Sequence, residues 1–340
     1  MNKDISRRKF VKIGGSLAIG GAFAAYAGGG LWNMFKHPEK LFYGSKVQSS
    51  DELVKEGEAL VSPYRRIFGF IVPDQIAAFE VSNGSIYIGT KNEISVYGMS
   101  GELQDKYAVP ADMRDLTVYD GNVYALYATR IEVYGAHGDK VRTIDACSET
   151  SDYNSLTVFD GGIFVTDASN KNICKYTLDG TLARFITSPS GFVVPSYCFG
   201  ITNMNGKVYC SNPGRHKIEQ YTAEGEFISS FGETGTAPGR FSGCCNPVII
   251  TPANNGEILT SEKGVPRISC YEGSGHFRSV LLDAKALGGG HAAYDVRVVK
   301  DKLIVAGGNK VSIFQYNKTL SQDTACGQCD KDCPLKTYNL

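Results

Sequence analysis

The chain has 340 residues, of which 42% are hydrophobic and 21% are charged, and its 35 basic residues balance its 35 acidic residues. A net charge of zero excludes a protein that binds nucleic acid through a basic surface, because such proteins carry an excess of Lys and Arg. Ten cysteines are too few, in a chain of this length, for a fold built from disulfides.

The first 35 residues have the layout of an export signal. Arg7 and Arg8 lie in the run SRRKFVK, and a Gly- and Ala-rich apolar stretch without an acidic residue follows from Val11 to Trp32. The run resembles the twin-arginine export signal of bacteria. The resemblance implies that the protein folds in the cytoplasm, often around a cofactor, and is then exported to the periplasm or to the outer side of the cytoplasmic membrane.

Two fates of the apolar stretch remain open. It is cleaved after Ala27, where small residues form a suitable site, or it is kept as a membrane anchor. A stretch of about 22 residues is long enough to cross a bilayer, and the protein would then contact the membrane through it. Residues 36–62 are expected to form a linker with a short capped helix.

An internal repeat predicts the fold of residues 63–317. An aromatic residue recurs in a shared local pattern, at Tyr97, Tyr134, Tyr176, Tyr221, Tyr271 and Phe314. Upstream of most copies, Asn-Gly or Asp-Gly separates two β-rich runs, as in hairpins with tight turns. Repeats of roughly 40 residues with three or four short strands are typical of propeller blades. The sequence predicts an all-β, six-bladed propeller, whose last blade is completed by the run RRIFGFIV that precedes blade one.

One repeat also carries a family resemblance. The segment from Ser211 to Phe241 resembles the NHL repeat, in which an Asn-His-Arg-Ile run precedes an aromatic residue and a glycine turn. His216 falls on this pattern, which favours a structural role for it. The resemblance implies an NHL-like propeller, a fold shared by binding modules, lyases and lactonases, so it does not define a function.

Residues 318–340 form a cysteine-rich tail. The spacing Cys326-x-x-Cys329-x-x-x-Cys333-Pro334 resembles half of a bacterial ferredoxin motif, which implies ligation of an iron–sulfur cluster. Such a cluster, or zinc as the alternative metal, needs about four ligands. Cysteines expected at the channel mouth are candidates for the fourth: Cys244, Cys245 and Cys198. Disulfides among these cysteines are the competing interpretation, because an oxidising compartment favours them.

The expected starts of the inner strands provide a second set of candidates. Asn154, Asn246 and Asp295 occupy such positions, and His291 precedes the inner strand of blade six. Oxygen ligands of this kind suit a divalent metal, as in propeller lactonases. A metal-dependent lyase or lactonase that works in the channel is therefore an alternative function, although no convincing set of carboxylates is present.

The interpretation favoured by the sequence is an exported binding module for a protein or ligand; enzyme activity is less favoured and stays open. Its expected partner is a protein of the cell envelope, in a redox system that uses a metal or iron–sulfur centre in the tail. No other cofactor is expected. A structural or interaction protein pinned by disulfides, without metal, is the third alternative.

Overall fold

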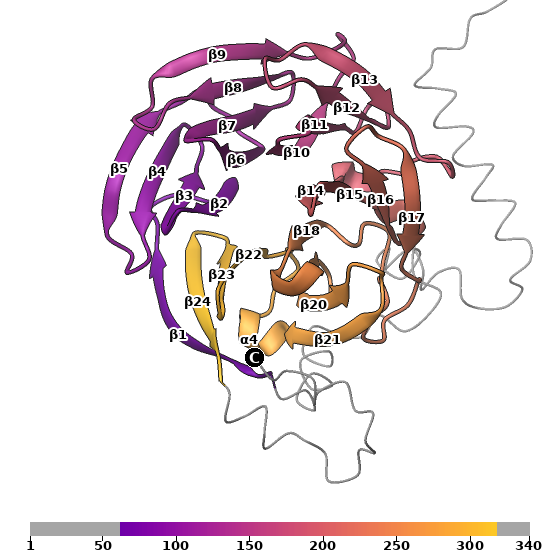
Figure 1. Ribbon diagram of the computed structural model, residues 1–340. Coiled ribbons are helices and arrows are strands. Elements are labelled where there is room, and N and C mark those ends of the chain that lie inside the picture. The colour runs from indigo at the N-terminus through magenta and orange to yellow at the C-terminus, as the bar shows by residue number, and fades with distance from the viewer. Residues whose placement is uncertain (1–61, 318–340) are drawn as a thin grey trace, which may run out of the picture. The chain divides into compact units, whose positions relative to one another are not determined.

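The computed structural model describes residues 62–317, which form a ring of six four-stranded antiparallel sheets (Figure 1). The predicted all-β six-bladed propeller is confirmed. The predictions for residues 1–35, for the linker up to residue 61 and for the tail at 318–340 fall outside the described range. Within residues 62–317, no helix is long and apolar enough to cross a membrane.

Blades one to five each run from the channel outward in chain order. Blades one and two consist of β2 (Ala78–Ser82), β3 (Ser85–Gly89), β4 (Glu93–Gly98), β5 (Leu103–Ala108), β6 (Asp115–Tyr119), β7 (Asn122–Tyr127), β8 (Arg130–Tyr134) and β9 (Lys140–Asp145). Blades three and four consist of β10 (Tyr153–Phe159), β11 (Gly162–Asp167), β12 (Asn172–Tyr176), β13 (Leu182–Ile186), β14 (Ile201–Met204), β15 (Lys207–Asn212), β16 (Lys217–Thr222) and β17 (Phe227–Phe231). Blade five consists of β18 (Ile249–Pro252), β19 (Glu257–Glu262), β20 (Arg267–Glu272) and β21 (Phe277–Leu282), and the short helix α4 (Ala284–Leu287) leads to blade six.

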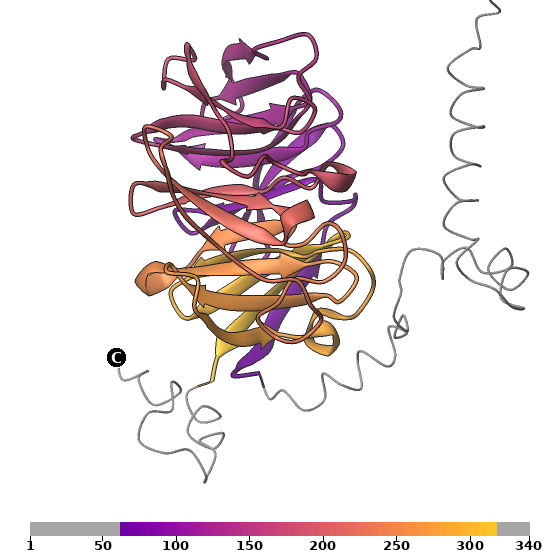
Figure 2. The same cartoon turned by 90° about the vertical axis from the view of Figure 1, so that its right-hand side faces the viewer.

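The N-terminal strand closes the ring. Blade six contains β22 (Asp295–Val299), β23 (Lys302–Gly307) and β24 (Lys310–Tyr316), and its fourth, outer strand is β1 (Tyr64–Ile71). Strand β1 pairs antiparallel with β24 from Tyr64–Tyr316 to Ile71–Lys310, with an irregularity between Arg66 and Phe68. Figure 2 shows the two strands side by side where the described chain enters and leaves the ring. The predicted closure by the run RRIFGFIV is therefore confirmed.

The inner hairpins have the turns that the dipeptides predict. Asn83 and Gly84 have φ values of 50° and 79°, and Asn205 and Gly206 have φ values of 52° and 72°. Two successive residues with positive φ make a turn whose twist matches that of paired strands, and Asn and Gly accept this conformation at least cost.

The core lies between neighbouring blades. The recurring aromatic residue is buried in blades two to six, with relative exposures of 0–3%, as in Tyr221 and Tyr271. One apolar cluster joins Leu126 and Ile131 of blade two to Ile163 and Val165 of blade three. Because this burial occurs between sheets, each blade is stabilised by its neighbours, and the inner strands are held rigidly around the channel.

Candidate functional site

The central channel contains a cavity of about 410 Å³. Its lining comes from the inner strands of all six blades, which are β2, β6, β10, β14, β18 and β22. These strands meet at the centre of the ring in Figure 1. A cavity of this volume, walled by a rigid scaffold, is of the size that small ligands occupy.

A half-buried arginine dominates one wall of the channel. Arg297 on β22 places its Nε 3.0 Å from Oε1 of Glu80 on β2, and it forms a second ion pair with Asp295. Its Nη2 also donates to the carbonyl oxygen of Phe79 at 2.7 Å. Burial alone would lower the pKa of Arg297, but the carboxylates of Asp295 and Glu80 outweigh it and raise the pKa above its ordinary value. The charged arginine therefore joins blade six to blade one inside the channel.

Asp115 adds a third carboxyl group to the same cavity. Burial raises the pKa of Asp115 to about 6, although hydrogen bonds from the Ser155 hydroxyl at 2.6 Å and the Leu156 N–H at 3.0 Å oppose the shift. Glu80, Asp115 and Asp295 thus share the cavity with two guanidinium groups, of which Arg297 already engages Glu80 and Asp295, while Arg114 pairs with Asp152. The excess of carboxyl oxygens favours a ligand that brings hydrogen-bond donors or positive charge.

Thiols and a lysine lie at the mouth of the channel. Cys198, which lines the cavity, has its Sγ 3.3 Å from Nζ of Lys263 in the turn between β19 and β20. The Sγ atoms of Cys244 and Cys245 are 3.1 Å apart, and both residues are free cysteines. Cys244 is exposed, whereas Cys245 is buried and has its Sγ 3.5 Å from the Ser196 hydroxyl. We call Cys198, Cys244, Cys245 and Lys263 the mouth cluster.

The thiols of the mouth cluster differ in acidity. Burial raises the pKa of Cys198, and Lys263 opposes this rise. Burial also disfavours the thiolate of Cys245, but hydrogen bonds from Ser196, Cys244 and Lys263 outweigh it and lower the pKa. Within the described residues, the three mouth cysteines do not bring all their sulfurs within metal-chelating distance of one another. A metal held here would need ligands from elsewhere.

The other sequence candidates are dispersed. Asn154 and Asp295 line the channel, but the Asn154 Oδ1 accepts from the Phe199 N–H at 2.9 Å. Asn246 is 2% exposed and hydrogen-bonds both backbone groups of Lys263 at 2.9 Å, so it positions the mouth cluster. His291 is exposed, and its carbonyl oxygen accepts from the Gly264 N–H at 2.9 Å. The structure does not gather these four residues into one ligand set, and Cys326, Cys329 and Cys333 lie outside the described residues.

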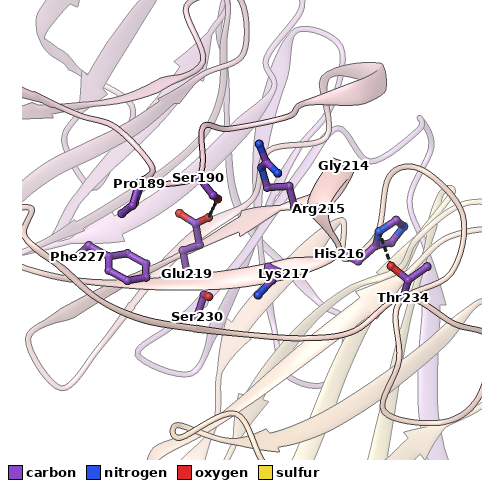
Figure 3. A pocket seen from close by; sticks show the side chains of 10 residues that line it. All are labelled: Pro189, Ser190, Gly214, Arg215, His216, Lys217, Glu219, Phe227, Ser230 and Thr234. Carbon is purple, nitrogen blue, oxygen red and sulfur yellow. Dashed lines mark hydrogen bonds between the residues drawn. The ribbon is translucent and has the colours of Figure 1, made fainter.

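A second cavity, of about 380 Å³, lies against blade four (Figure 3). His216 has its Nδ1 3.1 Å from the Thr234 hydroxyl and contacts the Gly243 carbonyl oxygen through Nε2. The buried Glu219 accepts from Ser188 and from Asn212, each at 2.8 Å. These bonds tie blade four to its own flanking loops, which is the structural role that the repeat pattern favours for His216.

Solved structures share this fold. Virginiamycin B lyase from Staphylococcus aureus aligns with a TM-score of 0.53 at 16% identity, over 74% of this chain and 99% of that chain. A catalytically inactive variant of the lyase with alanine in place of a histidine, solved with quinupristin, gives 0.53 at 15% identity over 74% and 99%. A protein of unknown function from Bacteroides thetaiotaomicron gives 0.55 at 10% identity, over 74% and 75%. No protein-family model and no curated protein matches the sequence. At such identities the likeness is one of fold.

Proposed function

We propose that the protein is an exported propeller that binds a ligand or a protein partner at its channel mouth. The observation that carries this proposal is the continuity of the mouth cluster with the channel cavity, because Cys198 belongs to both. The inner strands hold the channel lining in place before anything binds, so little ordering entropy is lost there on binding. The carboxyl groups of Glu80, Asp115 and Asp295 select a ligand that carries hydrogen-bond donors or positive charge.

The second part of the proposal is a redox or metal centre in the tail. Cys326, Cys329 and Cys333 would hold an iron–sulfur cluster or zinc, with Cys244 or Cys245 as the remaining ligand. Two features support this role: the Cys244 thiol is exposed, and the lowered pKa of Cys245 favours the thiolate, which is the form that binds metals. The resemblance of the segment around Arg7 and Arg8 to an export signal for folded proteins supports insertion of a metal before export.

Lyase activity is the less favoured function. The staphylococcal enzyme is inactive with one histidine replaced by alanine, whereas no histidine is among the described residues that line the channel here. The fold alone does not carry an activity from one propeller to another. The carboxyl groups of this channel and its arginines, Arg297 and Arg114, are held in ion pairs, which suits recognition.

The tail centre is tested with the full-length chain, produced without oxygen in iron-replete cells. We expect a broad visible absorption band with iron and acid-labile sulfide, and loss of all three in Cys326→Ser. The control is Cys210→Ser, because Cys210 is buried in blade four and does not belong to the mouth cluster. If zinc is the one metal found, the tail centre has a structural role and not a redox role. A metal-free chain with no free tail thiols would overturn the metal centre and leave the binding function.

Ligand binding in the channel is tested with spermidine as a cationic probe, by isothermal titration. We expect saturable binding that weakens several-fold in Asp115→Asn, because that substitution removes a carboxylate from the cavity. The matched control is Asp301→Asn, which removes an exposed carboxylate outside the channel. Equal binding by wild type and Asp115→Asn, or no saturable binding at low salt, would contradict a cation-selective channel.

A further inference from the structure

Two cysteines and an aspartate meet between blades two and three, away from the channel cavity. Cys147 lies in the loop after β9, Asp167 ends β11, and Cys174 lies on β12. One ligand atom from each lies within 4.8 Å of the others, and the two sulfurs are 3.2 Å apart. Among residues 62–317, this is the one group of His, Cys, Asp or Glu side chains with such spacing. Asp167 and Cys174 are fully buried, and Cys147 is half-buried.

The Asp167 carboxylate is buried without a cation. Its oxygens accept from the N–H groups of Asp152 and Asn170, each at 3.1 Å, and from the Asn170 side-chain amide at 2.9 Å. No ion pair joins it to a Lys or Arg among the described residues. A fully buried carboxylate whose partners are all neutral is costly, because neutral donors replace only part of its hydration.

In blade five, the equivalent buried carboxylate is paired with a cation. The equivalent of Asp167 at the end of the second strand is Glu262 in blade five, and the residue opposite it in the hairpin is Arg267. Arg267 pairs with Glu262 at 2.7 Å, with both side chains no more than 7% exposed. In blade three the residue opposite Asp167 is the neutral Asn172.

Blade four provides a second comparison. Asn212 stands at the position of Asp167, and Glu219 stands at the position of Cys174. The two bond each other directly at 2.8 Å, and Ser188 from the preceding loop completes the group. Blade three has instead one carboxylate and two thiols, and none of the three groups can carry a positive charge. Once the thiols lose their protons, the three groups are anions that repel one another. The group formed by Cys147, Asp167 and Cys174 therefore favours binding of a cation with affinity for sulfur.

We propose that Cys147, Asp167 and Cys174 bind a zinc ion. Zinc accepts thiolate and carboxylate ligands together, at about 2.3 Å from sulfur and 2.0–2.2 Å from oxygen. A tetrahedral ion would hold the two sulfurs about 3.8 Å apart, so they must separate by roughly half an ångström. Cys147 lies in a half-buried loop and can make this adjustment. The fourth position is left for water or for Ser151, whose hydroxyl is 3.5 Å from the Cys147 sulfur.

Binding releases the two thiol protons to solvent, because zinc takes cysteine as thiolate. The Cys147 thiol loses its proton more readily than an ordinary cysteine. Burial disfavours the Cys147 thiolate, but hydrogen bonds from Ser151, Tyr153 and Cys174 outweigh it and lower the pKa. Burial and the hydrogen bond with Cys147 raise the pKa of Cys174, so its proton leaves when the metal arrives. The site is a structural one that joins blades two and three, and it is independent of the channel and of the tail.

The experiment uses the full-length chain in a background with Cys244→Ser, Cys245→Ser, Cys326→Ser, Cys329→Ser and Cys333→Ser, so that a tail centre cannot contribute. The reduced protein is dialysed against Zn²⁺ and assayed for bound metal and for protons released in weak buffer. We expect one zinc per chain, close to two protons per zinc, and a Tm that falls when a chelator is added. Cobalt substitution should give intense sulfur-to-metal charge-transfer bands.

Three variants test whether Cys147, Asp167 and Cys174 hold the zinc ion. Cys174→Ser and Asp167→Asn should each lower zinc affinity by at least tenfold and remove the chelator effect on Tm. Cys270→Ser is the matched control, because Cys270 is also buried on the third strand of its blade, and it should bind zinc like the background. Zinc uptake that survives Cys174→Ser would overturn the site. So would a background chain that takes up no zinc after reduction, including one isolated with a Cys147–Cys174 disulfide.

Discussion

The ammonium group of Lys263 lies 3.3 Å from the sulfur of Cys198, although the two residues are 65 positions apart in the chain. Lys263 comes from the turn between β19 and β20, whereas Cys198 precedes β14 of the neighbouring blade. The contact places a positive charge beside a thiol at the channel mouth. A thiol in such surroundings is more reactive than burial alone would allow, because thiolate is the reactive form.

Removal of this charge should slow the reaction of Cys198 with alkylating reagents. In Lys263→Met, burial continues to disfavour the thiolate while its main electrostatic support is lost, so the pKa of Cys198 should rise further. We expect several-fold slower alkylation of Cys198 by iodoacetamide at pH 7 to 8, measured by peptide mass spectrometry. Lys207→Met, at an exposed position of β15, is the control and should leave the rate unchanged. Identical rates in wild type and Lys263→Met would show that the contact with Lys263 does not change the reactivity of the Cys198 thiol.

Arg297 should be the most sensitive position of the channel. Its guanidinium engages Asp295 and Glu80, and the side chains of all three are no more than 23% exposed. Arg297→Leu removes the guanidinium from two half-buried carboxylates and leaves each with a backbone N–H donor, from Val81 or Val296, which should cost about 3 kcal/mol in the free energy of unfolding. Urea denaturation measures this loss. Arg240→Leu, which breaks an exposed pair with Glu233, should cost less than about 1 kcal/mol. Similar losses in both variants would mean that the channel network contributes little to ring closure.

The blades were predictable because their signals are local. A turn such as Asn83-Gly84 needs positive φ at two successive residues, and few dipeptides satisfy that need. The closing strand was predictable for a related reason. The last blade ends at β24 with three strands of its own, and a β-rich run near the start of the described chain was available to complete it.

The site was only partly predictable, because its contacts are not local. The repeat placed Cys244 and Cys245 before an inner strand, but nothing in the pattern relates Lys263 to Cys198. Arg297 and Glu80 were missed, since the two lie 217 residues apart and meet only when the ring closes. An arginine within an inner strand was the available signal. Cys147 and Cys174 lie 27 positions apart, and their contact depends on how the loop after β9 crosses to blade three.

Strand β1 should contribute to stability through Phe70. Its ring packs 5.1 Å from that of Tyr97 in blade one, and it adjoins the apolar cluster between blades six and one. Phe70→Ala should lower the free energy of unfolding by about 2 kcal/mol, which is less than for a fully buried ring. Ile71→Ala is the control, because Ile71 is 71% exposed on the same strand and its loss should cost under about 0.5 kcal/mol. If Phe70→Ala matches Ile71→Ala in urea denaturation, β1 does not lock the ring.

Asp115 should give the stability of the protein a dependence on pH. Burial raises the pKa of Asp115 to about 6 in the folded state, from 3.8. Between these values the folded protein binds more protons than the unfolded chain, so the contribution of this group is fully present below about pH 4 and is lost as the pH rises to about 6. The loss should be on the order of 2–3 kcal/mol, since each pKa unit corresponds to about 1.4 kcal/mol. Urea denaturation at pH 4 to 7 should therefore show that wild type loses more stability than Asp115→Asn over this interval. Asp301→Asn, which changes an exposed carboxylate, should follow the wild-type curve, and parallel curves for wild type and Asp115→Asn would show that Asp115 titrates normally in the channel.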